Sequence, residues 1–234
     1  MMLRFVNARN DKKKLNEIKK LYDEAFPKEE QIPFWILRKA SRTSTADLMQ
    51  VYDDDLLVGF IHLVYFEDVV YLYYFAIEPD ERGQGYGSKI LQALRRRFSA
   101  RRIILNIEVV DENCDNYEER KKRKSLSENG FREAGYSTRE YGVEYEMLYL
   151  GGNVSYEEFL ALIRKYFGRT LALMVKKNLK KRKEKGIDKG GQNPSLSSVH
   201  LFSCQVCGKR SNGLFQLLES RDDAKSDVYF PAFQ

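Results

Sequence analysis

Apolar residues recur at strand and helix spacings through the first two thirds of the 234-residue chain. Short apolar or alternating runs predict strands at residues 3–7, 48–52, 57–65, 69–77, 103–110, 131–139 and 143–150. One helix is predicted between a cap at Asp11 and Pro27. Further helices are predicted over residues 33–40, 88–98 and 116–128. This order predicts an α/β fold with a mixed sheet and helices on both of its faces.

The chain changes character after residue 150. Ser155 and Glu158 form the pattern of a capping box and predict a helix that follows them. The basic run at residues 176–185 is expected to be a solvated helix end rather than a nucleic-acid contact. We therefore expect a domain over residues 1–150, a basic helical extension over 151–185 and a flexible tail over 186–234.

The charge of the chain supports this division. The formal net charge is +6, but residues 1–150 hold 25 Lys and Arg against 26 Asp and Glu. The basic excess therefore lies in the tail and says little about what the first domain binds. No apolar run is long enough to cross a bilayer, and neither a signal peptide nor a disulfide framework is evident. We expect a cytoplasmic protein without membrane insertion.

A zinc site in the tail is not expected. His200, Cys204 and Cys207 supply three candidate ligands, whereas a closed structural zinc site has four.

A glycine-rich segment lies between the strand at 69–77 and the helix at 88–98. Arg82 precedes glycines at positions 83, 85 and 87. Glycine allows successive backbone amides to converge on one point, and the helix that follows adds the positive end of its dipole. Neither the P-loop pattern nor the Gly-x-Gly-x-x-Gly dinucleotide pattern is present. The segment predicts a diphosphate site with Arg82 as the cation at its rim.

These residues resemble the GCN5-related N-acetyltransferase (GNAT) superfamily. Arg82, Gly85 and Gly87 match its coenzyme A signature, Arg/Gln-x-x-Gly-x-Gly/Ala. The run from Ala76 to Pro79 resembles the end of the family's fourth strand, and Asn129-Gly130-Phe131 resembles the turn before its C-terminal hairpin. The resemblance covers about residues 1–150 and implies a GNAT-like, twisted and mostly antiparallel sheet.

The resemblance also implies a cofactor and an activity. The chain would be an N-acetyltransferase that uses acetyl-CoA and acts on an amine of a small molecule or a protein. The fourth strand would hold the pantetheine arm through backbone groups near Phe75, Ala76 and Ile77, one of whose amides would stabilise the oxyanion. Backbone amides of the glycine-rich segment would hold the pyrophosphate, namely those of Gly83, Gln84, Gly85, Tyr86, Gly87 and Ser88.

Glu108 is the candidate catalytic base, because the acceptor amine must lose a proton before it attacks. Alternation places Glu108 on the same strand face as Asn106. A solvated or structurally paired carboxylate is the competing interpretation. Glu29 and Glu30 fall in the region that shapes the acceptor pocket in such folds and could attract a cationic amine, but an exposed charged loop is the commoner explanation.

The sequence departs from the family at the general acid. A tyrosine is expected four residues before Gly130, where this chain has Leu126, with Ser127 next to it. Tyr136 and Tyr141 are nearby in sequence and are the candidates for a substitute proton donor. This departure predicts slow turnover, or an acyl-CoA-binding sensor or regulatory module with little turnover. The acceptor and the oligomeric state are not encoded in any motif.

Overall fold

The computed structural model describes residues 3–109, 124–140, 143–177 and 179–180. The expectations for Tyr141, for the cysteines, for most of the helix at 116–128 and for the tail lie outside these residues. None of the helices in the described part of the chain combines the length and the apolarity needed to cross a bilayer.

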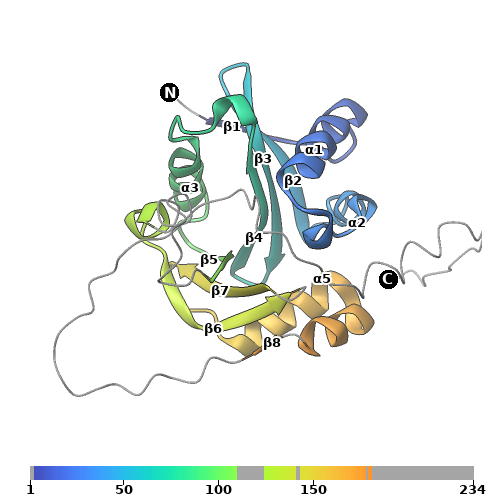
Figure 1. Cartoon of the computed structure of the whole chain (residues 1–234), viewed down its shortest axis with the longest axis vertical. Coiled ribbons are helices and arrows are strands. Elements are labelled where there is room, and N and C mark those ends of the chain that lie inside the picture. Colours follow the sequence, from blue (N-terminus) through green and yellow to red (C-terminus); the bar gives the residue numbers. More distant parts are fainter. Residues whose placement is uncertain (1–2, 110–123, 141–142, 178, 181–234) are drawn as a thin grey trace, which may run out of the picture.

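The described strands form one mixed sheet (Figure 1). The sheet runs in the order β1 (Leu3–Asn7), β2 (Ala46–Asp53), β3 (Leu56–Phe66), β4 (Val69–Ile77), β5 (Arg102–Glu108), β7 (Val143–Leu150), β6 (Arg132–Glu140) and β8 (Leu179–Lys180). Within these residues β4 and β5 pair in parallel, and every other pair of neighbours is antiparallel. The predicted α/β fold with a mostly antiparallel sheet is confirmed.

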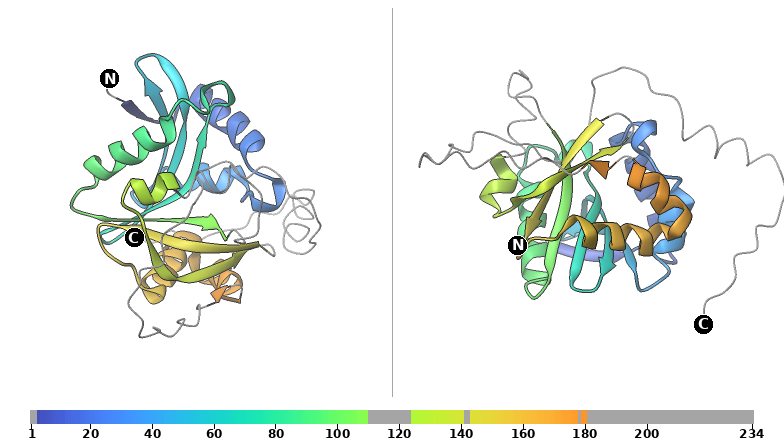
Figure 2. Two further views of the ribbon diagram at one scale, coloured as in Figure 1. Left: turned by 60° about the vertical axis from the view of Figure 1, so that its left-hand side comes forward. Right: turned by 90° about the horizontal axis from the view of Figure 1, so that it is seen from below.

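Helices cover both faces of the sheet (Figure 2). The labelled helices are α1 (Lys12–Ala25), α2 (Phe34–Ala40), α3 (Tyr86–Arg97) and α5 (Tyr156–Lys177), with the short 3-10 helices η1 (Lys28–Glu30) and η2 (Pro79–Glu81). One face carries a core built with α3 and the helical residues 124–128. The opposite face carries two cores, one beneath α1 and α2 and one beneath α5. The site described below lies between these layers.

The first helix forms as its sequence predicts. The Asp11 side chain accepts hydrogen bonds from the amides of Lys13 and Lys14 at the N-terminus of α1. Its predicted apolar face is buried and consists of Leu15, Ile18, Leu21, Tyr22 and Ala25. Burial of each large side chain on this face stabilises the fold by about 1.5–3 kcal/mol. The helix ends at Ala25, two residues before Pro27.

The C-terminal helix α5 packs against the sheet. The predicted capping box is present: the Ser155 amide donates to Glu158 Oε2 at 2.8 Å, and the Glu158 amide donates to Ser155 Oγ at 3.2 Å. Phe159, Leu162 and Ile163 are buried against the sheet. The helical path is interrupted at Gly168, where φ is 79° and ψ is 170°, a region that only glycine occupies readily.

The basic run that starts at residue 176 was predicted to be a helix end, but its described part includes a short strand. Leu179 and Lys180 form β8, which pairs with Thr138 and Ser137 of β6. Without β8, β6 would be an edge strand that offers backbone groups to another segment. Propensity along the basic run does not reveal a pairing with residues about 40 positions away.

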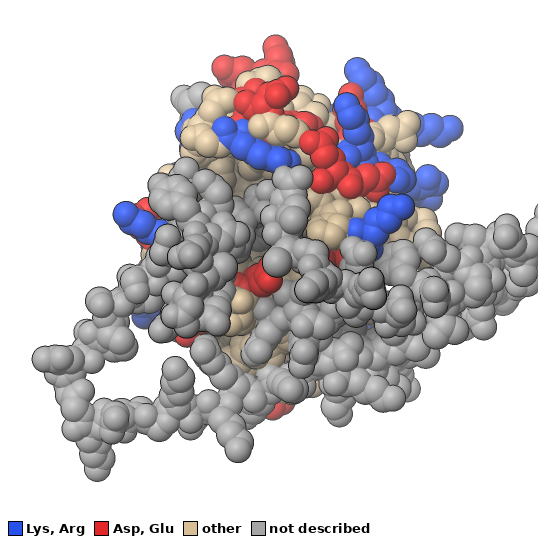
Figure 3. All heavy atoms as spheres, viewed as in Figure 1, with Lys and Arg blue, Asp and Glu red and all other residues tan. Residues whose placement is uncertain are grey.

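The described surface carries both signs of charge. Figure 3 shows Lys and Arg side chains over α1 at the upper right, mixed with Asp and Glu side chains that also gather near the β2–β3 turn at the top. Asp54 and Asp55 of that turn are exposed.

Candidate active site

The two central strands, β4 and β5, separate soon after they begin. Their parallel ladder consists of Val69 with Arg102, Val70 with Ile103 and Tyr71 with Ile104. Beyond these pairs β4 continues to Ile77 beside β3, and β5 continues to Glu108 beside β7. The strands therefore diverge as a V, which Figure 1 shows between β4 and the β5–β7 pair.

A bulge in β4 lies where the strands diverge. His62 pairs with Tyr74, but the next residue of β3, Leu63, pairs with Leu72, so Tyr73 is the extra residue. An extra residue interrupts the alternation of side chains. Tyr73 and Tyr74 accordingly both pack on the face of α1, α2 and α5, whereas Leu72 and Phe75 pack on the α3 face.

The glycine-rich segment forms the turn from η2 into α3. Gly83 and Gly85 have φ of 80° and 78°, in the left-handed region that glycine occupies without steric cost. Gly85 is the N-cap of α3, so no side chain caps the first amides of this helix. A Cβ at Gly83, Gly85 or Gly87 would meet nothing within 4 Å. The backbone here is open to an approaching ligand.

Arg82, the predicted cation of this segment, is half-buried. Its Nε donates to the carbonyl of Ile77 at 3.2 Å and so ties the turn to the end of β4. Its Nη2 is buried and has no hydrogen-bond partner among the described residues. Because a buried N–H without an acceptor is costly, this atom fits an anionic ligand.

The other side chains of the segment anchor it. Gln84 Nε2 donates to the Asp80 carbonyl and to Glu81 Oε2, at 3.2 and 2.9 Å. The Tyr86 ring lies in the core, and its hydroxyl donates to Asp53 Oδ2 at 2.8 Å.

Ser88 holds α3 to the helical residues 124–128. Its hydroxyl lies 2.7 Å from that of Ser125. Since the side chains of Gln84, Tyr86 and Ser88 are engaged within the protein, contacts to a ligand fall to the backbone.

The strand residues Phe75, Ala76 and Ile77 are all buried. Phe75 and Ile77 pack on the α3 face, and Ala76 packs on the opposite face. A Cβ on Gly59 of β3 would lie 2.2 Å from the Ala76 carbonyl oxygen, so the two strands pack backbone to backbone at this point. This close packing fixes the position of the β4 backbone relative to β3 at the end of β4, on one side of the V.

Glu108 and Asn106 lie on the face of β5 opposite α3. Ile103, Leu105 and Ile107 pack on the α3 face, and Ile104 packs under α5, so alternation assigns Asn106 and Glu108 to the α5 side. The Tyr71 hydroxyl donates to Asn106 Oδ1 at 3.1 Å, across the point where the strands begin to separate. Glu108, the last residue of β5, is half-buried.

The segment that contains the V and the glycine turn also matches the model of a known family. The model of the acetyltransferase (GNAT) family matches residues 15–119. Residues 15–119 of this chain are therefore similar to a GNAT acetyltransferase domain.

Solved structures agree with this fold. A protein from Bacteroides thetaiotaomicron, described as a GNAT-family acetyltransferase, has a TM-score of 0.57 and 24% sequence identity, over 74% of this chain and 98% of its own. An aminoglycoside 6'-N-acetyltransferase, solved in complex with coenzyme A, has a TM-score of 0.50 and 16% identity, over 64% of this chain and 96% of its own. No curated protein sequence matches the chain significantly.

Beyond the matched segment, the chain has an apolar residue where the resemblance leads us to expect a tyrosine. Leu126 is fully buried in the α3 core and cannot donate a proton, and Ser127 is exposed. Tyr136 is buried against Phe159 and Tyr156 of α5, and this burial raises the pKa of its hydroxyl. The other tyrosine near in sequence, Tyr141, lies outside the described residues.

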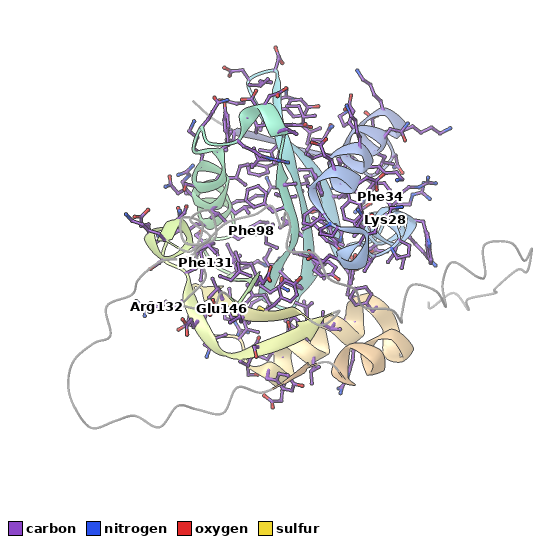
Figure 4. All side chains as sticks on the ribbon, viewed as in Figure 1. Lys28, Phe34, Phe98, Phe131, Arg132 and Glu146 are labelled. Atoms are coloured by element: carbon purple, nitrogen blue, oxygen red, sulfur yellow. The ribbon has the colours of Figure 1, made fainter. Side chains whose placement is uncertain are left out.

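The acidic pair before α2 falls in η1, and the buried Tyr74 ties η1 and the residues after it to the sheet. The Tyr74 hydroxyl donates to the Glu30 carbonyl at 2.9 Å and accepts from the Ile32 amide at 3.2 Å. Figure 4 shows Lys28 and Phe34 on this side of the sheet and Phe98 and Phe131 on the α3 side.

Sequence reasoning missed the aromatic residues around the V. Those that the structure brings together are Tyr71, Tyr73, Tyr74, Tyr166 and Phe167. The run Tyr73-Tyr74-Phe75 breaks the strict alternation of a strand and is the one local signal that indicates a bulge. The contribution of α5 has no such signal, since Tyr166 lies 93 positions from Tyr73.

Proposed function

We propose that this chain is an N-acetyltransferase that moves an acetyl group from acetyl-CoA to a primary amine of a small molecule or a protein. The observation that supports this most is the divergence of β4 from β5 beside the open glycine turn. Together they would offer one ligand a strand edge and the backbone amides of the turn, and the family match supports this proposal.

The residues present fit acetyl-CoA. The buried Arg82 Nη2 lacks an acceptor among the described residues, and the space beside Gly83, Gly85 and Gly87 is open, so both suit a pyrophosphate. Backbone groups of residues 75–77 would hold the pantetheine arm. When bound, the cofactor supplies an acetyl group activated as a thioester.

Glu108 would accept the proton that the acceptor's ammonium group must lose. Its carboxylate suits this role because Glu108 is the last residue of β5 and lies on the side of the sheet opposite the α3 core. Asn106 and Tyr71 would keep this part of β5 in place beside β4 through their hydrogen bond.

Leu126 supports low turnover, because general acid catalysis typically contributes ~10²–10⁴ in rate and this side chain provides none. The same observation supports the alternative of an acyl-CoA sensor. Incubation with acetyl-CoA and a panel of amines, followed by detection of free thiol, separates the two. Amine-dependent thiol release supports the enzyme, whereas tight binding without release for any amine supports the sensor.

The cofactor site is tested by Gly85→Val with Gly87→Ala as its control. Gly85 requires a left-handed backbone that valine resists, whereas Gly87 has no positive φ and lies in the first turn of α3. Calorimetry with coenzyme A should show that Gly85→Val loses at least tenfold in affinity and that Gly87→Ala keeps it. Equal affinities in two folded variants would contradict the assigned site.

The base is tested by Glu108→Gln. We expect a fall in kcat of about 10²-fold at neutral pH, with recovery at higher pH, where more of the amine is already neutral. The pH–rate profile checks this, with Glu128→Gln as an exposed control. An unchanged profile would remove Glu108 from the mechanism.

A further inference from the structure

An aromatic cluster lies beside the V, on the side of the sheet that carries α1, α2 and α5. It is centred on Tyr73, the extra residue of the β4 bulge. Its ring centroid is 5.1 Å from that of Tyr71 and 4.7 Å from that of Tyr74, both on β4. Two rings of α5 complete the cluster: Tyr166 at 5.9 Å and Phe167 at 6.0 Å, both edge-on to Tyr73. Tyr73, Tyr166 and Phe167 are each half-buried, so parts of these rings reach the surface.

The position of α5 over the cluster is set by contacts at two points. At its start, Glu158 pairs with Arg102, the first residue of β5, at 2.8 Å. Further along, the Tyr166 hydroxyl lies 2.7 Å from Nε2 of the fully buried His62. His62 Nδ1 lies 3.0 Å from the Asp47 carbonyl, which can only accept, so Nδ1 donates to it and Nε2 accepts from Tyr166.

Three hydroxyl groups of the cluster are engaged in hydrogen bonds within the protein. Tyr166 donates to His62, Tyr71 donates to Asn106 and Tyr74 donates to Glu30. Phe167 adds a wholly apolar ring to the cluster. Phe167 is also the last residue before the break at Gly168, which holds it at the end of a helical segment.

Glu108 and Asn106 lie on this same side of the sheet, opposite the α3 core. The hydrogen bond from Tyr71 to Asn106 and the ring contact between Tyr71 and Tyr73 link this face of β5 to the cluster, so the carbon skeleton of an amine beside Glu108 would have aromatic rings as neighbours. An aromatic surface gains free energy by covering apolar groups and gains little from a hydroxylated or highly charged chain.

We propose that α5, which lies beyond the segment matched by the family model, selects the acceptor. Tyr73, Tyr166 and Phe167 bind the body of an amine whose reactive group is attached to an aromatic or branched apolar skeleton. This inference rests on the proposed acetyl transfer.

The first experiment compares four amines, each with a primary amino group, in the full-length protein. Phenethylamine and isoamylamine represent the proposed class, and ethanolamine and spermidine represent polar and polycationic amines. Calorimetry measures the binding of each amine without acetyl-CoA, and thiol release measures KM. We expect affinities and KM values at least tenfold more favourable for the apolar pair. Equal values, or a preference for spermidine, would overturn the proposal.

The second experiment changes the surface. Phe167→Ala should raise KM for phenethylamine about tenfold, through loss of ring contacts, and leave KM for acetyl-CoA unchanged. Lys165→Ala, an exposed neighbour on α5, is the control that should change neither constant. Phe167→Leu keeps an apolar side chain and should show an intermediate value even if the alanine variant folds poorly. Unchanged amine preference in folded Phe167→Ala and Phe167→Leu would overturn the role of α5.

The two levels of the hypothesis fail differently. Absence of thiol release with every amine, together with tight coenzyme A binding, counts against acetyl transfer. Thiol release with no preference for apolar amines leaves acetyl transfer intact and removes only the selection by α5.

Discussion

His62 links α5 to the sheet through a single neutral imidazole. It is fully buried, and burial lowers its pKa to about 3. Protonation would place a proton on Nε2, the atom that accepts from Tyr166. In the unfolded chain the pKa of a histidine is roughly 6.5. Between these values the unfolded chain binds a proton that the folded chain does not, so stability is highest above pH 6.5 and falls as the pH decreases toward 3.

His62→Gln should therefore weaken the dependence of stability on pH. In the natural protein we expect the free energy of unfolding to fall by up to about 1.4 kcal/mol per pH unit below pH 6.5. Urea unfolding at pH 7, 6 and 5 measures this slope. The basic partners of Asp11, Asp68 and Glu158 lower the pKa values of these carboxyl groups, so the three groups titrate below this pH range. Identical slopes in the two proteins would show that His62 is not the group responsible.

At the scale of elements, the contact of β3 with β4 depends on Gly59. An added Cβ would lie 2.2 Å from the Ala76 carbonyl oxygen, so Gly59→Ala must push the two backbones apart. We expect a loss of about 1–3 kcal/mol in stability and weaker coenzyme A binding, because the displaced residues belong to the V. Thermal unfolding and calorimetry check both, with Gly87→Ala as the control. A variant with normal stability and affinity would contradict the backbone contact.

The elements could be predicted from the sequence better than the site could. The strands at 3–7, 69–77 and 143–150, the Asp11 cap and the capping box before α5 depend on local patterns, and they are confirmed. The glycine turn was also identified, because positive φ and a helix N-terminus leave a local signature. The aromatic cluster, the Tyr166–His62 contact and β8 depend on pairings between distant residues, which no local periodicity encodes.

At the scale of the whole molecule, coenzyme A should stabilise the folded chain. A ligand at 100 times its Kd adds about 2.7 kcal/mol, which a thermal unfolding curve detects as a higher Tm. Hydrogen exchange should locate the effect, with added protection at residues 72–77 and 83–88 and little change in α1. A rise in Tm with protection confined to other strands would place the ligand elsewhere.

The shortness of the β4–β5 ladder has a consequence for cooperativity. Among the described residues, three residue pairs of the β4–β5 ladder join the strands β1–β4 to the strands β5–β8 within the sheet. Side chains in the cores beneath α3 and α5 provide the remaining coupling across this line. The two halves of the sheet are thus able to open with separate free energies. A ligand that adds hydrogen bonds along the V would merge them into one cooperative unit, so that substrate binding changes how the molecule unfolds as well as how strongly it resists unfolding.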